Sequence, residues 1–100
     1  MHKELNVIPQ KKDNHSSQKI GDEIIVVPIV NDIAQMTDLY TLNETAAFIW
    51  ENLDGLNSLN DILNLMINNF EINETEAKAD LFSFMEEINT FVEIKVPHEK

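Results

Sequence analysis

The sequence predicts an α+β domain, a small winged helix-turn-helix-like fold in which an N-terminal three-stranded antiparallel sheet is followed by three helices. A chain of 100 residues is long enough for one domain with a modest core. Before residue 43, short β-branched runs are separated by turn residues, whereas the later segments carry apolar residues at helical spacing. A group of strands followed by a group of helices is typical of the α+β class.

The predicted strands come first. Residues 18–20 and 23–27 predict a hairpin, because Gly21-Asp22 between them suits a two-residue turn. Asn31-Asp32 marks the next turn, and a third strand is expected over residues 34–40.

The chain divides into three parts. The polar residues 1–17 are predicted to form a flexible N-terminal arm, with an edge strand through Leu5, Val7 and Ile8 as an alternative for part of it. Residues 18–94 form the predicted domain. Residues 95–100 are expected to be a frayed tail.

The first helix is predicted over residues 43–54. Asn43 is a good N-cap, although Thr41 with Glu44 offers a competing capping box. Gly55 after Asp54 suits the left-handed position that often ends a helix. The residues on its buried face are Ala46, Ile49, Trp50 and Leu53.

Two further helices are expected. The second runs from Ser58 to about Asn69, with Asp61 in its first turn, and the third begins after Asn73 and extends to Thr90 or beyond. The predicted buried residues of these helices are Leu59, Ile62, Leu63, Met66 and Phe70, then Ala77, Leu81, Phe84, Ile88, Phe91 and Val92.

The charge of the chain bears on its partners. Eighteen acidic and seven basic side chains give a net charge of −11. Such a field repels nucleic acid and anionic membranes, and it attracts basic peptides or basic enzyme surfaces. There is no cysteine, no secretory signal and no run of about 18 apolar residues, so a cytoplasmic protein without a membrane partner is expected.

Catalytic residues are not evident. The three histidines, His2, His15 and His98, lie in the predicted arm and tail, where a reactive group cannot be held firmly. The chain has only two glycines and therefore no glycine-rich phosphate loop. We expect a protein that is not an enzyme and that needs no metal or cofactor.

DNA binding is a remote alternative, since a winged helix is a common DNA-binding fold. A recognition helix normally brings Arg and Lys to the phosphates. The predicted third helix offers only Lys78 among many acidic residues, so nucleic acid is not an expected partner.

Peptide recognition by strand addition fits the predicted elements better. A three-stranded sheet leaves edges at which an extended peptide can pair. On the third helix, Lys78, Phe82, Met85 and Asn89 form a flank beside the core stripe. Phe82 lies about 100° from the centre of the apolar face, so it either contacts a guest or packs within the domain.

Two more apolar residues lie off their helices' buried faces. Phe48 and Leu65 occupy positions where polar residues are usual, so they could mark a docking surface for an enzyme or a second copy. Isolated surface hydrophobes are common, which is the competing interpretation.

One motif resembles a known family. The pattern Tyr-x-Leu-Asn-x-x-Ala-x-x-Ile-Trp-x-x-Leu-Asp-Gly, which ends at Gly55, resembles the PqqD family associated with pyrroloquinoline quinone (PQQ) biosynthesis and related peptide-modifying pathways. The resemblance extends over residues 18–94.

The resemblance implies a function. PqqD-like proteins are recognition elements that bind the leader of a ribosomally made precursor peptide beside the third strand and the third helix. They present it to a modifying enzyme, such as a radical S-adenosylmethionine (radical SAM) protein. By that resemblance the peptide-binding residues are Met36, Thr37, Asp38, Leu39, Tyr40, Lys78, Phe82, Met85 and Asn89.

The partner stays open at this stage. The acidic balance does not point to the quinone pathway in particular, and a domain that kept the fold but changed its partner is the alternative. An exposed edge strand would also allow a homodimer.

Overall fold

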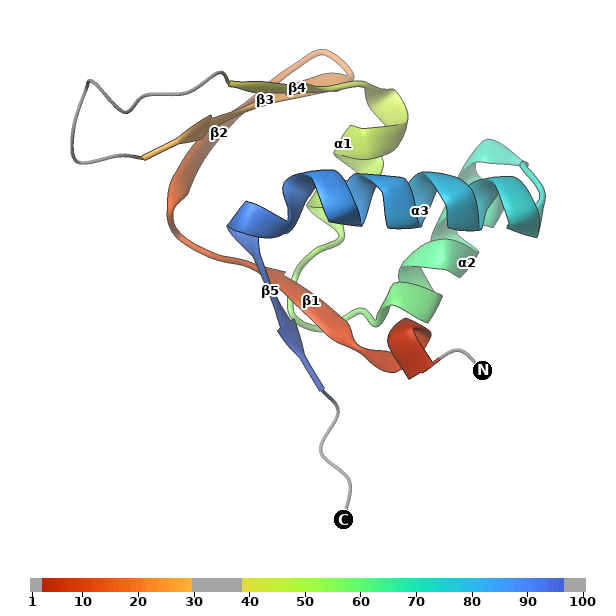
Figure 1. The fold of residues 1–100 in the computed structure, drawn as a ribbon. Helices are drawn as coiled ribbons and strands as arrows, with labels where there is room; N and C mark the ends of the chain where they lie inside the picture. The colour runs from red at the N-terminus through yellow and green to blue at the C-terminus, as the bar shows by residue number, and fades with distance from the viewer. Residues whose placement is uncertain (1–2, 30–38, 97–100) are drawn as a thin grey trace.

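The protein is an α+β domain with three helices and two antiparallel sheets, which confirms the predicted class (Figure 1). The computed structural model describes residues 3–29 and 39–96. The elements in chain order are η1 (Lys3–Asn6), β1 (Ile8–Lys11), β2 (His15–Ile20), β3 (Glu23–Pro28), β4 (Tyr40–Leu42), α1 (Glu44–Glu51), α2 (Leu59–Phe70), α3 (Glu74–Ile88), η3 (Asn89–Phe91) and β5 (Val92–Lys95).

The predicted hairpin is confirmed as β2 and β3. Gly21 has φ of 62° at the first position of the two-residue turn, as a type II′ turn requires. β4 adds to β3 and is an edge strand of the sheet β2-β3-β4. The third strand was predicted over residues 34–40, but it begins at Tyr40 in the described part of the chain, and residues 34–38 lie outside that part.

The register of this sheet determines which backbone groups point outward. A two-residue hairpin loop makes Ile20 and Glu23 a hydrogen-bonded pair, so alternate residues of β3 face β2 and the others face β4. Ile24 and Val26 therefore pair with Leu42 and Tyr40. It follows that Thr41 directs its N–H and C=O away from β3, toward the outer edge of β4.

The second sheet corrects the prediction of a single N-terminal sheet. β1 and β5, from opposite ends of the chain, pair antiparallel. The predicted flexible arm therefore contains regular structure from Lys3 onward, and β5 extends into the predicted tail. The physical reason is burial, because Leu5 and Pro9 contribute to the interior.

The loop between α1 and α2, together with the first residue of α2, covers the other edge of β1. The amide of Gly55 donates to Pro9 O at 3.0 Å, and the amide of Leu59 donates to Val7 O at 3.0 Å. Gly55 has φ of 79°, and an added Cβ would lie 3.0 Å from the side chain of Gln10. Gly55 thus serves the contact with β1, and it does not close the first helix as predicted.

The helix starts follow the predicted caps. The Asn43 carboxamide accepts the amide of Ala46, so the competing start at Thr41 is not used. Ser58 and Asp61 form the capping box of α2, and Asn73 caps α3.

The helix ends differ more from prediction. α1 stops at Glu51, before the expected Asp54, and α3 stops at Ile88. The chain then turns through η3 into β5, so Phe91 and Val92 are buried from these elements and not from a longer helix.

Trp50 lies where several elements meet. It is buried on the same side of α1 as Ile49, and the His15 ring packs edge-on against it with ring centroids 4.9 Å apart. His15 also packs against Phe91, with centroids 5.6 Å apart. The sequence placed His15 in a flexible arm, whereas the structure makes it part of the packing between β2, α1 and η3.

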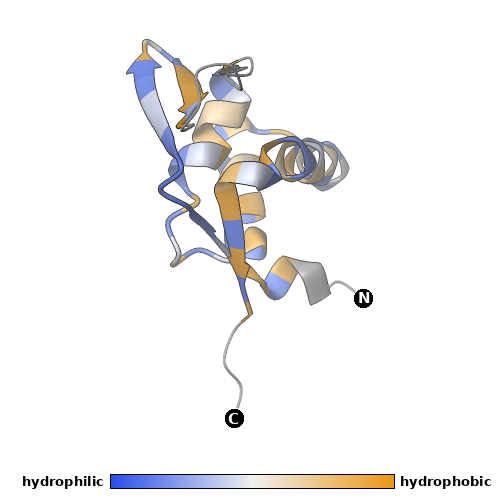
Figure 2. Ribbon diagram, turned by 60° about the vertical axis from the view of Figure 1, so that its left-hand side comes forward, coloured by the Kyte–Doolittle hydropathy of each residue, from blue (hydrophilic) through white to orange (hydrophobic). Residues whose placement is uncertain are grey.

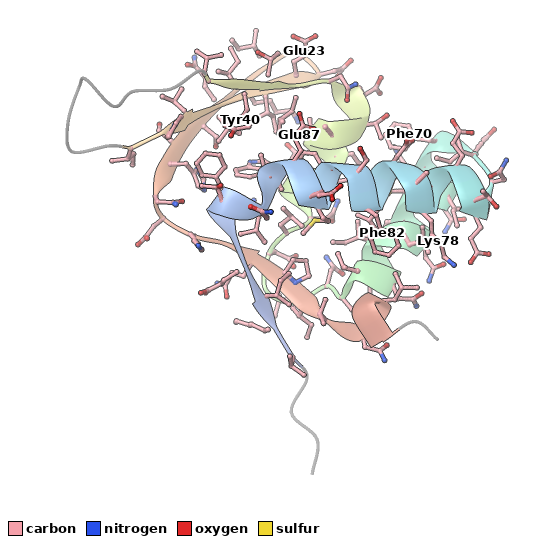
Figure 3. All side chains as sticks on the ribbon, viewed as in Figure 1. Glu23, Tyr40, Phe70, Lys78, Phe82 and Glu87 are labelled. Atoms are coloured by element: carbon pink, nitrogen blue, oxygen red, sulfur yellow. The ribbon has the colours of Figure 1, made fainter. Side chains whose placement is uncertain are left out.

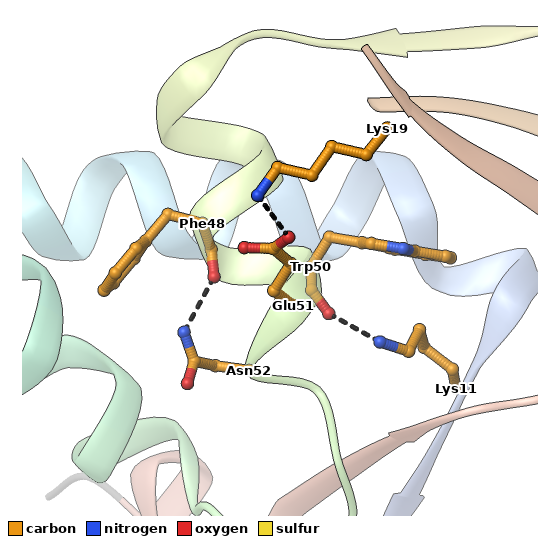
Figure 4. A network of polar contacts seen from close by, with 6 residues as sticks. All are labelled: Lys11, Lys19, Phe48, Trp50, Glu51 and Asn52. Atoms are coloured by element: carbon orange, nitrogen blue, oxygen red, sulfur yellow. Dashed lines mark hydrogen bonds and ion pairs between the residues drawn. The ribbon is translucent and has the colours of Figure 1, made fainter. Parts of the chain in front are cut away.

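Two side chains satisfy carbonyls in the last turn of α1 (Figure 4). Lys11 Nζ donates to Trp50 O at 3.0 Å, and Asn52 Nδ2 donates to Phe48 O at 2.8 Å. The last carbonyls of a helix lack intrahelical partners and carry partial negative charge, so an ammonium group there is favourable. Lys11 thereby joins β1 to α1.

Replacing Lys11 should measure this link. The Lys11→Met variant keeps the apolar stem but loses the donor, and we expect its free energy of unfolding to fall by about 1–2 kcal/mol in urea. The exposed neighbour Lys12 provides the control, since Lys12→Met should change stability by less than about 0.5 kcal/mol. Equal losses in the two variants would contradict a capping role.

His15 should make stability depend on pH. Burial lowers the pKa of the His15 imidazole, and the charge of Lys11 acts in the same direction, while the Lys12 backbone and Asp13 oppose them. Neither ring nitrogen has a well-formed hydrogen bond within the described residues.

The folded state therefore binds the His15 proton less readily than the unfolded state does. The contribution of neutral His15 to the free energy of unfolding is fully present above the unfolded pKa of about 6.5. This contribution is lost as the pH falls below that value. Urea unfolding between about pH 7.5 and pH 5.5 should show wild-type stability falling, and His15→Phe should reduce the fall. An unchanged pH dependence in His15→Phe would contradict this assignment.

Candidate peptide-binding groove

A groove runs between the edge strand β4 and helix α3. It consists of two adjoining hollows of about 330 Å³ and 220 Å³ that share four lining residues. The first hollow extends along β4, and the second continues along the start of α1 toward the middle of α3. The shared residues are Asn43, Ala46, Phe84 and Glu87.

The N-terminal part of α1 separates the two walls of the groove. Asn43 holds the first turn of this helix, and Ala46 one turn later leaves space where a larger side chain would fill the hollow. Ile49 lies below it in the core. The base of the groove is therefore formed by small or largely buried apolar side chains, while most of its exposed lining is polar, and its position depends on the start of α1.

The α3 wall is acidic. Asp80, Ser83 and Glu87 are exposed along it, and Phe84 is buried between them. Figure 3 shows Glu87 on the side of α3 that faces Tyr40. Among residues 3–29 and 39–96, no Lys or Arg lines either hollow, so the described lining presents carboxylates without compensating cations.

Of the peptide-binding residues predicted on the third strand, only two lie in the described part of the chain. Leu39 and Tyr40 line the groove, and Leu39 is exposed. Met36, Thr37 and Asp38 lie outside the described residues.

The predicted helix residues lie elsewhere on α3. Phe82, Met85 and Asn89 line a separate apolar hollow of about 480 Å³ beside β5, and Lys78 pairs with Glu74 at 3.5 Å. Figure 3 places Phe82 and Lys78 on the side of α3 away from Tyr40. The structure thus brings Leu39 and Tyr40 together with Phe84 and Glu87, and it separates them from the predicted flank.

Sequence reasoning missed the α3 residues that do line the groove. The prediction that Phe84 belongs to the core is correct, but Phe84 also lines the groove. Asp80, Ser83 and Glu87 surround Phe84 at spacings of three and four residues, so they share its face. That spacing is the signal that could have found them.

The two predicted docking residues differ in exposure. Phe48 is partly buried and packs edge-on against Phe70, with centroids 5.2 Å apart. Leu65 is 39% exposed on α2. Phe48 therefore has an internal partner, whereas Leu65 remains available at the surface.

Neither a metal-binding cluster nor a membrane-spanning helix is present in the part of the chain that the structure describes. Over residues 3–29 and 39–96, no three histidine or carboxylate side chains gather closely enough to hold a metal ion. Within the same ranges, no helix is long and apolar enough to cross a bilayer.

Comparison with known families identifies the chain. The sequence model described as "Coenzyme PQQ synthesis protein D (PqqD)" matches residues 23–90. The chain belongs to the PqqD family. The matched region contains β3, β4 and all three helices, and therefore the whole groove between β4 and α3.

The PqqD fold is also found in a solved structure that is similar to this chain. That structure is described as "TbiB1 in Complex with the TbiA(beta) Leader Peptide", and it superposes with a TM-score of 0.68 at 17% sequence identity. The match covers 81% of this chain and 88% of that one. A comparison with curated proteins gave no match.

Proposed function

We propose that this PqqD-family protein is a non-catalytic adaptor that binds the leader of a ribosomally made precursor peptide in the groove between β4 and α3. The observation that carries the proposal is the outer edge of β4, which has no strand partner within residues 3–29 and 39–96 and lies beside an open groove, in the fold of a protein described with a leader peptide. The bound peptide would then be presented to a modifying enzyme, such as a radical SAM protein of the PQQ type or another peptide-tailoring enzyme.

Strand addition is supported by the register. Thr41 directs its backbone N–H and C=O toward the groove side of β4, where an extended guest can pair with both. Side chains of the guest alternate, so every second one would face the floor formed by Ala46 and Phe84. Main-chain pairing would supply affinity and the floor would select side chains.

The charge of the groove favours a basic guest. Asp80 and Glu87 are separated by two turns on one face of α3, and no Lys or Arg in the described part of the chain lines the groove. The protein as a whole carries a net charge of −11, which attracts a positively charged peptide over a distance of about a Debye length. We infer that the bound part of the leader carries Lys or Arg on the side facing α3.

Loss of the outward amide tests strand addition. Thr41→Pro removes the N–H that a guest would use and leaves the pairing of β4 with β3 intact, so we expect at least tenfold weaker leader binding. Ser17→Pro is the matched control, because Ser17 directs its amide away from β3 at the opposite edge of the same sheet.

The measurement is an amide NMR titration with the leader of the short peptide encoded nearest to this gene. Shifts at Leu39–Asn43 and Asp80–Glu87 that saturate in wild type and in Ser17→Pro would support the groove. Equal affinity in Thr41→Pro and Ser17→Pro would rule out strand addition at β4. If no amide shift changes at about 1 mM leader, the better explanation is the alternative, a domain that kept the PqqD fold but binds a different partner.

Charge reversal tests the selection of a basic guest. Glu87→Lys should weaken binding of a basic leader about tenfold at low salt, and the difference should shrink as salt is raised. Glu86→Lys makes the same change on the neighbouring residue, which lines the hollow beside β5 and not the groove. Calorimetric titration of both variants should show the larger loss in Glu87→Lys, and equal losses would indicate only a net-charge effect.

Docking of the modifying enzyme remains a separate proposal. The exposed Leu65 is the better candidate contact, because Phe48 is engaged by Phe70. A Leu65→Lys variant that binds leader normally but no longer associates with the enzyme would support it. Unchanged association would remove Leu65 from the docking surface.

A further inference from the structure

β5 is an edge strand whose sequence is complementary to itself. It pairs with β1 on one side, and its other side has no strand partner within residues 3–29 and 39–96. Both β1 and β5 lie outside the region matched by the PqqD family, residues 23–90. The family resemblance therefore does not explain this edge.

The hydrogen bonds of β1 show which groups of β5 are free. Lys11 N and Pro9 O bond to the loop before α2, so the residues between them in β1 face β5. Gln10 therefore forms a hydrogen-bonded pair with Glu93, and Ile94 lies opposite Pro9 in a non-hydrogen-bonded position. It follows that Ile94 directs its N–H and C=O outward.

The side chains of β5 alternate between an apolar and a charged face. Ile94 is 50% exposed and lies on the same face as Val92, toward α3. Val96, which is 77% exposed, continues this face, while Glu93 and Lys95 extend from the other. Figure 2 shows the alternation as orange and blue bands along the strand that leads to the C-terminus.

An antiparallel pair of two such strands is matched at every position. When Ile94 pairs with Ile94 of a second copy, Glu93 of each copy lies opposite Lys95 of the other. Val92 of each copy lies opposite Val96 on the apolar face. The Ile94 residues exchange their free backbone groups, and the charged pairs take the non-hydrogen-bonded positions, where side chains approach more closely.

The apolar face of this pairing has space beside it. Phe82 and Met85 of α3 line the hollow of about 480 Å³ that Val92 and Ile94 close from the β5 side. Phe82 is 36% exposed there. Val96 of the second copy, opposite Val92, would lie at this hollow and would cover apolar surface that is otherwise open to water.

We propose that the protein forms a two-fold symmetric dimer through antiparallel pairing of β5 with β5, which joins the two small sheets into one of four strands. The occupant of the edge is a second copy of this chain, because its charges and its apolar residues complement themselves under a two-fold axis. This inference does not depend on peptide binding, since the groove lies at β4.

The dimer is expected to be weak. One strand pair with its flanking side chains buries less surface than a standard interface, and two copies with a net charge of −11 each repel one another. We therefore expect a dissociation constant of about 0.1 mM at an ionic strength of about 0.15 M, where long-range repulsion is screened.

Sedimentation equilibrium from about 10 µM to 1 mM tests the dimer, and charge variants test its register. Glu93→Lys and Lys95→Glu each place like charges opposite one another, so each variant alone should dimerise about tenfold more weakly than wild type. An equimolar mixture of the two variants restores opposite charges in every pair and should form a mixed dimer. Both residues are exposed, so folding should be preserved, and amide spectra check this.

A backbone variant gives an independent measurement. Ile94→Pro removes the outward N–H without affecting the pairing with β1, and it should weaken the dimer at least tenfold. A wild-type protein that stays monomeric at about 1 mM would overturn the proposal. Dimerisation that is insensitive to Ile94→Pro and to the charge variants would overturn it equally, because the interface would then lie elsewhere.

Discussion

The structure depends on the burial of Trp50 at the end of a helix too short to be stable alone. α1 has eight residues, well below the length at which isolated helices persist in water. Its position comes from tertiary contacts, in which Trp50 packs against His15 while Lys11 binds the carbonyl of Trp50. The ammonium of Lys11 also lies 5.2 Å from the centre of the indole ring, within range of a cation–π attraction. The Trp50 residue thus connects α1 with both β1 and β2.

This junction determines the groove. Ala46 and Ile49 lie on α1, so the floor of the groove moves with that helix, and Phe84 of α3 packs against the same core. An ion pair between Lys19 and Glu51, 3.0 Å long, adds a contact between β2 and the end of α1, although exposed pairs of this kind contribute little. A rigid floor between an edge strand and a helix is what a guest strand requires, because a loose groove would raise the entropic cost of binding.

Local signals in the sequence were sufficient for the helix starts and the hairpin. Each helix is capped by a side chain that accepts the amide three residues later, and the capping residues are Asn43, Ser58 and Asn73. The hairpin turn requires only the positive φ of Gly21. The pairing of β1 with β5 could not be read in this way, because its partners are separated by most of the chain and each strand alone has only four residues. The end of α2 also lacked a signal, since Glu71 takes the left-handed position, with φ of 56°, that glycine usually occupies.

The residues of α3 that line the groove could likewise be predicted only in part from the sequence. The sequence identified Phe84 as core and Phe82 as a flank residue, and both statements hold. It did not determine which flank of α3 faces β4, because that depends on how the helix is rotated about its axis when it packs on α1. The result is two different surfaces on opposite sides of α3, one acidic beside β4 and one apolar beside β5. A basic guest in the first would lower the net charge of each copy, and would thereby reduce the repulsion that opposes pairing at the second. If both proposals hold, the two surfaces would be linked through long-range charge, because no described residue lines both.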